Sequence, residues 1–195
     1  MNNKNNVSRP VPYREARHRI RDGDLLLYRR RGLIAVAGRG THSHAGKAAW
    51  WGDDLFLLEI LQGVGGRAVT LSSQVRPYPG RWDVYQVNAD DRWPGYDRAE
   101  ATRFMRRLCG CDYGYTGVLL AAMLHLPLLR CFVRPSVEDQ MVEKRPPFCS
   151  HACAMADRIG GKVDPVPHLA DRLTEPADLA RSPFYKYRFT LTDGR

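Results

Sequence analysis

Three residues far apart in the sequence, Cys149, His44 and Glu59, have the side chains that a thiol-dependent hydrolase uses. A thiolate nucleophile needs a base that takes up its proton and later protonates the leaving group, and an imidazole is suited to both steps. The base in turn needs a third group that fixes its tautomer and orientation. Residues of these types favour acyl transfer through a thioester intermediate.

The stretch RPPFCSHACAMADRIGG, residues 145–161, predicts a helix whose first turn contains Cys149. The two prolines favour an extended entry, and the two final glycines are typical of a left-handed helix stop. Unpaired N–H groups and the positive end of the helix dipole favour a thiolate in the first turn, and they can also stabilise an oxyanion. The alternative is a small buried cysteine that packs like an apolar side chain.

His44 and Glu59 lie on two predicted strands, Thr41–Trp50 and Leu55–Leu61, that are joined by the hairpin connection Trp51–Asp54. A two-residue loop would place His44 opposite Glu59, and a four-residue loop would make them diagonal neighbours. Both registers put the two side chains on one face of the sheet. A carboxylate within the apolar run LFLLEIL is costly unless it is paired, as it would be by His44, or points to solvent from an edge strand.

A second histidine, His42, lies two positions before His44 and is therefore expected on the same face of that strand. The base is accordingly His44 or, two positions earlier, His42. Tyr113 and Tyr115 are candidates for lining a substrate pocket, or for packing a loop against the core. Ser150, beside Cys149, is the third residue that we assign to substrate binding.

The other periodic segments predict a mixed α+β protein in which an antiparallel sheet or small barrel packs against helices. We expect a disordered lead-in over residues 1–12 and a single domain over residues 13–195. Short helices are predicted over 13–20, 97–108 and 174–180. Strands are predicted for the apolar run that follows the turn at 22–24 and ends at residue 28, and over 67–75, 81–87 and 184–191.

The composition is that of a folded, strongly basic chain. The 195 residues are 44% hydrophobic and 26% charged, and the net charge is +9, with only five Lys among the 30 basic residues. An arginine-rich surface suits anionic polymers or lipid head groups. The basic residues are dispersed and form no nucleic-acid-binding motif, so we expect a peptide or acyl substrate and no specific nucleic acid as partner.

Five cysteines without the spacing of a disulfide framework, and a polar first segment without a signal sequence, favour the reducing cytoplasm. The most apolar window, residues 117–133, is too short for a bilayer span and contains His125 and Arg130. We therefore expect a buried helix or helix pair there and no transmembrane segment.

A structural zinc site is an alternative from another functional class, since soft ligands are numerous. The ligands would be Cys109, Cys111, Cys149, His151 and Cys153. On a helix, however, Cys149 and Cys153 share a face from which His151 points away. We expect no metal and no cofactor, and a non-catalytic, zinc-stabilised binding protein is kept as an alternative function.

The chain resembles the circularly permuted members of the NlpC and papain-like superfamily, of the YiiX/YaeF type. The matching segments are GDLLLY, SHAG, LLEILQGVGGRAVTL, CDYGYTG, FCSHACA and PADLARSP, in collinear order from Gly23 to Pro183. The resemblance implies a permuted papain-like fold and a cysteine amidase or peptidase acting on cell-wall-type peptides. It also implies that Cys149 is the nucleophile, His44 the base and Glu59 the orienting residue of a Cys-His-Glu triad.

A related branch suggests a different substrate. FCSHAC is similar to the Cys-x-His element of the lecithin:retinol acyltransferase-like enzymes, which form a thioester with a lipid acyl group. Those enzymes have a histidine as the third residue, whereas this chain has Glu59, which favours the hydrolase branch. A lipid-directed thiol acyltransferase or esterase is therefore the alternative enzymatic function.

Overall fold

The computed structural model describes residues 10–30, 40–115 and 146–194, and the findings below concern these ranges. The expected apolar segment 117–133 and the first nine residues of the expected lead-in lie outside them. Residues Pro10–Pro12, at the end of the expected lead-in, form an edge strand instead. Within the described ranges, no helix has the length and apolar character needed to cross a membrane.

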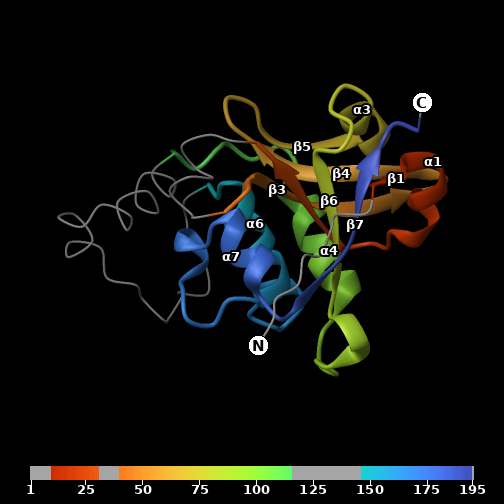
Figure 1. The fold of residues 1–195 in the computed structure, drawn as a ribbon. Coiled ribbons are helices and arrows are strands. Elements are labelled where there is room, and N and C mark those ends of the chain that lie inside the picture. The colour runs from red at the N-terminus through yellow and green to blue at the C-terminus, as the bar shows by residue number, and fades with distance from the viewer. Residues whose placement is uncertain (1–9, 31–39, 116–145, 195) are drawn as a thin grey trace.

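The protein is built on one seven-stranded sheet with the order β1-β7-β6-β2-β3-β4-β5 (Figure 1). Neighbouring strands are antiparallel, except that β1 runs parallel to β7. The strands are β1 (Pro10–Pro12), β2 (Leu25–Arg29), β3 (His42–Trp51), β4 (Asp54–Leu61), β5 (Gly65–Thr70), β6 (Trp82–Val87) and β7 (Tyr185–Thr192). The expected α+β class is confirmed.

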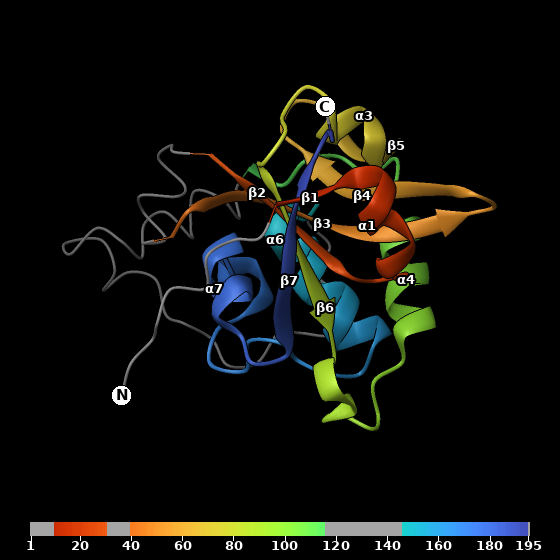
Figure 2. The same ribbon diagram turned by 45° about the vertical axis from the view of Figure 1, so that its right-hand side comes forward.

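Helices cover both faces of the sheet, as the two views in Figures 1 and 2 show. One core lies between the sheet and α4, α6 and α7, and a second lies between the sheet and α1 and α3. The helices are α1 (Tyr13–Ala16), α3 (Leu71–Val75), α4 (Arg98–Arg107), α6 (Cys149–Met155) and α7 (Pro176–Arg181). A π-helical turn, η4 (Ala156–Gly160), continues α6, and 3₁₀ turns occupy η1 (Arg17–Arg19), η2 (Ala89–Asp91) and η5 (Asp171–Leu173).

The strand expected over residues 67–75 is only half correct. β5 ends at Thr70, and the chain then turns into helix α3. Leu71 and Val75 are both buried in the core beneath α1, and their spacing of four residues is the spacing of one helix face. A helical turn buries both side chains, whereas an extended chain four residues long would carry the second one away.

The end of the Cys149 helix also differs from expectation. Gly161 has φ −82°, so it is right-handed, and the residue with positive φ is Lys162. Gly161 is required for close packing, because a Cβ there would lie 2.2 Å from the ring of Tyr96. The glycine pair therefore allows the end of the helix to approach the segment that leads into α4.

Candidate active site

The site begins where two paired strands separate. β3 and β4 pair from Trp51↔Asp54 to Gly46↔Glu59, and beyond that point β3 keeps only its pairing with β2. The register is the one that we expected for a four-residue loop, in which Glu59 is the diagonal neighbour of His44. The main chain of His44 and Ala45 is thereby free on the side that β4 has left.

Glu59 is buried and fully paired. Its Oε2 lies 2.5 Å from Nε2 of His44, and Arg67 on β5 holds Oε1 at 2.8 Å from Nε and 2.6 Å from Nη2. Burial disfavours the charged carboxylate, but His44 and Arg67 outweigh this effect and lower the pKa of Glu59. The alternative of a solvent-facing Glu59 is wrong, because the residue is only 2% exposed.

Cys149 is the first residue of α6 and is 4% exposed. The His44 ring and the main-chain N–H groups of Ala45 and Ser150 lie beside its sulfur as hydrogen-bond donors. Burial alone would raise the pKa of the thiol, but the charge of His44 and these hydrogen bonds lower it. The helix start and the unpaired end of β3 therefore supply donors to the same sulfur.

His44 connects the sulfur to the carboxylate. Since Nε2 is bonded to Glu59, Nδ1 is the ring nitrogen left for Cys149. Burial disfavours the charged ring, but the neighbouring sulfur and carboxylate outweigh this and raise the pKa of His44 to about 10. The arrangement thus favours a thiolate beside an imidazolium at neutral pH, as a nucleophilic sulfur requires.

The sulfur opens onto a cavity of about 600 Å³, here called the Cys149 cavity. Its polar lining includes Arg30, Ser43, Gln62, Arg67 and Gln74, and its aromatic walls are Tyr28, Tyr78, Trp82 and Tyr113. The cavity can therefore accept a carbonyl compound that carries both apolar and hydrogen-bonding groups.

The three residues expected to bind substrate have different positions. Tyr113 lines the Cys149 cavity and packs against Phe148 and Cys149. Tyr115 stacks edge-on against Tyr113 but is not among the lining residues. The Ser150 side chain is fully buried away from the cavity, where its hydroxyl donates to the carbonyl oxygen of Thr174 at 2.8 Å.

The loop that carries Tyr113 is fixed to the edge strand β5. Gly66 donates to the carbonyl oxygen of Cys111 and accepts from the N–H of Gly110, both at 2.7 Å. The approach is so close that a Cβ on Gly66 would lie 1.9 Å from the carbonyl oxygen of Leu108. Gly66, near the start of β5, thus positions one wall of the Cys149 cavity.

His42 does not share the face of His44, contrary to expectation. Tyr28 pairs with His44 and the next residue, Arg29, pairs with His42, so β3 has a bulge at Ser43. The bulge turns His42 to the other face, where its Nε2 lies 2.8 Å from Oδ2 of the buried Asp83. The two rings therefore belong to separate hydrogen-bond networks.

A buried ion pair that the sequence analysis missed links the Cys149 helix to β3. Lys47 is 1% exposed, and its Nζ lies 2.6 Å from Oδ2 of Asp157, in the π-helical turn that continues α6. Asp157 also accepts from the hydroxyls of Tyr96 and Tyr185. The only signal in the sequence was a lysine within an otherwise small and apolar strand segment.

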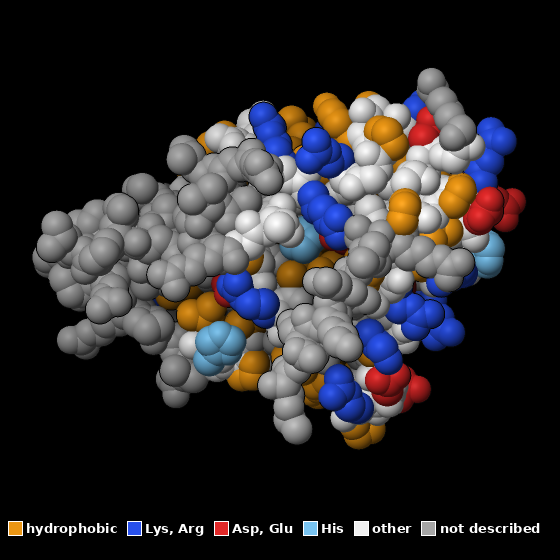
Figure 3. Space-filling view, in the orientation of Figure 1, with side chains coloured by type: hydrophobic (Ala, Val, Ile, Leu, Met, Phe, Trp, Pro, Cys, Tyr) orange, Lys and Arg blue, Asp and Glu red, His pale blue; other side chains and the backbone are white. Residues whose placement is uncertain are grey.

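The side chains considered as alternative zinc ligands do not form a site among the described residues. All five lie in the described ranges, where no group of three or more His, Cys, Asp or Glu side chains is arranged to hold a metal ion. The four described cysteines are free thiols. Figure 3 shows Lys and Arg side chains dispersed over the described part of one face, consistent with the dispersed basic residues in the sequence.

Comparisons with known proteins identify a structural neighbour. No family model matches the chain, and no curated protein matches it. Among solved structures, the chain is similar to the metalloprotein YiiX from Escherichia coli O157:H7, with a TM-score of 0.59 and 12% sequence identity. The match covers 88% of this chain and 97% of that one, which confirms the expected likeness to the YiiX fold.

Proposed function

We propose that this protein is a cysteine hydrolase with a permuted papain-like fold, in which Cys149 is the nucleophile, His44 the general acid and base, and Glu59 the orienting residue. The observation that carries the proposal is that the His44 ring, which is hydrogen-bonded to the Glu59 carboxylate, lies beside the Cys149 sulfur at the start of α6. The lowered pKa of the Cys149 thiol and the raised pKa of the His44 ring support it, because both favour the reactive ion pair.

The reaction proceeds in two steps. The Cys149 thiolate attacks the carbonyl carbon of the substrate, and the leaving nitrogen or oxygen takes the proton of the His44 imidazolium, which leaves a thioester on the sulfur. A water molecule then attacks the thioester as neutral His44 accepts a proton from it. The acid product departs, and the thiolate and imidazolium are restored. Glu59 keeps the ring oriented through both steps.

The substrate that we propose first is a peptide-type amide. The side-chain amides of Gln62 and Gln74 line the Cys149 cavity and can pair with peptide groups. One observation favours an acyl ester as the second candidate, namely the aromatic walls formed by Tyr28, Trp82 and their neighbours. Parallel assays of amides and esters with the same acyl group separate the two candidates.

The name of the structural neighbour calls it a metalloprotein, which raises the question of a metal in this chain. The described ranges contain no cluster of three side chains suited to a metal ion. Glu59 is saturated by His44 and Arg67, and its oxygens are not free to act as ligands. The described residues do not fit a metal site, and we derive no step through one.

Labelling with an electrophilic thiol probe at pH 7 tests the proposal. We expect Cys149 to react faster than the other cysteines. His44→Ala should slow the labelling of Cys149 by tenfold or more, because the thiolate then loses the positive charge of the imidazolium beside it. Glu59→Gln should slow labelling less. Cys109→Ala, which changes a half-buried thiol with a raised pKa, serves as the control and should leave the rate unchanged.

The same variants are then assayed for turnover of peptide amides and acyl esters. Cys149→Ala and His44→Ala are expected to abolish hydrolysis. Full turnover by Cys149→Ala would refute the mechanism. Equal labelling of all four described cysteines would show that Cys149 is not activated.

A further inference from the structure

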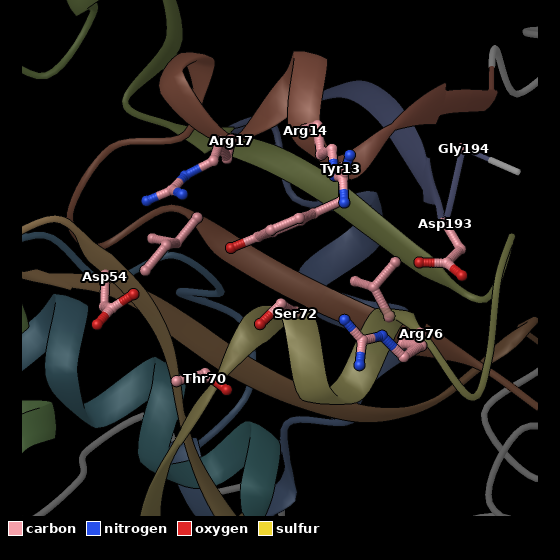
Figure 4. A pocket seen from close by; sticks show the side chains of 11 residues that line it. Tyr13, Arg14, Arg17, Asp54, Thr70, Ser72, Arg76, Asp193 and Gly194 are labelled. Atoms are coloured by element: carbon pink, nitrogen blue, oxygen red, sulfur yellow. The ribbon is translucent and has the colours of Figure 1, made fainter.

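A second cavity, of about 780 Å³, lies between α1, α3 and the C-terminal end of β7. We call it the arginine cavity, because Arg14, Arg17 and Arg76 line it together with Tyr13, Asp54, Leu55, Thr70, Ser72, Val75, Asp193 and Gly194. Figure 4 shows Tyr13 extending from α1 into its middle, with Ser72 on α3 and Arg76 directly after α3 facing it. Its lining comes from three parts of the chain, residues 13–17, 54–76 and 193–194.

Most hydrogen-bond donors in the arginine cavity have no acceptor among the residues that the structure describes. Among the described residues, no acceptor pairs with the guanidinium groups of Arg14 and Arg76 or with the hydroxyls of Tyr13, Thr70 and Ser72. Arg17 donates to the main-chain oxygen of Asp53. Donors without an acceptor in the described part of the chain, placed by separate elements around one cavity, suit a ligand rich in acceptor oxygens.

Charge in the cavity is not uniform. Arg17 and Asp54 line one side of the view in Figure 4, and Arg76 and Asp193 line the other. Among the described lining residues, three guanidinium groups face two carboxylates, so the net charge of these residues is positive. Because the pocket contains its own carboxylates, a bound anion must lie close to the arginines, and removal of a carboxylate should strengthen its binding.

The arginine cavity is distinct from the Cys149 cavity, since the two have no lining residue in common. Helix α3 and the turn after it separate them. Ser72, Val75 and Arg76 face the arginine cavity, whereas Gln74 and Tyr78 line the Cys149 cavity. A ligand in one cavity is therefore not part of the reacting group in the other.

We propose that the arginine cavity binds an anionic group, a phosphate or a carboxylate, between α1 and α3. Arg14 and Arg76 supply the charge, and the hydroxyls of Tyr13 and Ser72 supply further donors. Guanidinium groups bind both kinds of anion through paired N–H donors. The proposal is independent of the reaction proposed for Cys149.

Titration of the full-length protein with inorganic phosphate, pyrophosphate or citrate at constant ionic strength tests the proposal, with amide chemical shifts in nuclear magnetic resonance spectra as the readout. We expect saturable shifts at α1 and α3, and an affinity that falls about fivefold or more in Arg14→Gln and in Arg76→Gln. Arg107→Gln, on α4 against the other face of the sheet, removes the same charge and should leave the affinity unchanged. Comparison of phosphate with citrate identifies the type of anion.

A second pair of variants tests for the opposite change, an increase in anion affinity. Asp54→Asn removes a lining carboxylate and should tighten binding, whereas Asp91→Asn, an exposed change in η2, should not. Cys149→Ala should bind as the unchanged protein does. The proposal would be overturned if the chemical-shift changes did not saturate or were confined to residues of the Cys149 cavity. It would also be overturned if all three arginine variants lost affinity equally.

Discussion

Gly46 lies directly opposite Glu59 in the last paired position of β3 and β4, on the same face as His44. A Cβ at Gly46 would lie 2.6 Å from the carbonyl oxygen of Leu58 and 3.3 Å from the Cβ of Glu59. The absence of a side chain at this position leaves the space through which the Glu59 carboxylate reaches its diagonal neighbour. The glycine of the SHAG segment is thus part of how the site is positioned.

Gly46→Ala should therefore slow thiol labelling of Cys149 and reduce the free energy of unfolding by about 1–3 kcal/mol, a typical cost of overpacking. Gly95→Ala is a suitable control, because a Cβ there would meet nothing within 4 Å. Labelling rates and chemical denaturation measure the two effects. If Gly46→Ala and Gly95→Ala behaved alike, the close contact at Gly46 would have no consequence for the site.

The pH dependence of the site follows from the two shifted pKa values. Labelling should increase as the thiol deprotonates, at a pH below its usual range, because His44 lowers the pKa of Cys149. Hydrolysis should decrease again near pH 10, where His44 loses the proton that the leaving group needs. Between pH 5 and 11, the labelling rate should thus follow a sigmoidal curve against pH, and the hydrolysis rate should follow a bell-shaped curve.

His44→Ala should move the labelling curve to higher pH, since burial then raises the pKa of the thiol without opposition from the imidazolium. An unchanged midpoint in this variant would mean that the ring does not activate the sulfur.

Glu59→Gln should move the alkaline limb of hydrolysis to lower pH. The carboxylate is one of the groups that raise the pKa of His44, so its neutralisation lets the ring deprotonate sooner. We expect a shift of about one pH unit, which corresponds to about 1.4 kcal/mol. The pH–rate profiles of the two proteins measure it, and coincident alkaline limbs would contradict the orienting role of Glu59.

His42→Gln should leave the labelling rate of Cys149 within about twofold, because the bulge at Ser43 turns this ring away from the sulfur. The variant should instead reduce stability by about 1–3 kcal/mol, since Asp83 loses a partner while it stays buried. Labelling and denaturation curves, compared with those of His44→Ala, distinguish the two histidines. A loss of labelling as large as that in His44→Ala would assign His42 to the site.

Lys47→Met should reduce the free energy of unfolding by about 3–5 kcal/mol, because Asp157 would remain as a buried charge without its counter-ion. The double variant Lys47→Met with Asp157→Asn should recover part of this loss, since no charge is then left uncompensated. Urea denaturation of the single and double variants gives the coupling free energy. Additive effects would show that the pair does not stabilise the attachment of α6 to β3.

Local patterns in the sequence accounted for the parts of the site that depend on nearby residues. Two prolines followed by small residues located the start of the Cys149 helix, and the alternation of side chains placed His44 and Glu59 on one face for either loop length. The hairpin length did not matter for that conclusion, because both registers differ by an even number of residues. That the two side chains share a face was therefore predictable without the fold, whereas their contact was one of two alternatives.

Features that depend on distant residues were not predictable. The bulge at Ser43 reverses the face of His42, and alternation alone gives no sign of it. The burial of Lys47 depends on Asp157, which is 110 residues away. The side chain of Ser150 points to Thr174 because the helix face it occupies is set by packing against the rest of the domain.

The main-chain bonds that join Gly66 to Gly110 and Cys111 have a consequence beyond the position of Tyr113. An edge strand with free N–H and C=O groups is a template on which a second molecule can extend the sheet, and such pairing leads to aggregation. In β5, the main-chain N–H and C=O groups of Gly66 are already hydrogen-bonded to the loop that contains Gly110 and Cys111. Substitution of Gly66 by a larger residue would force the loop away, and the exposed strand would then be open to intermolecular pairing.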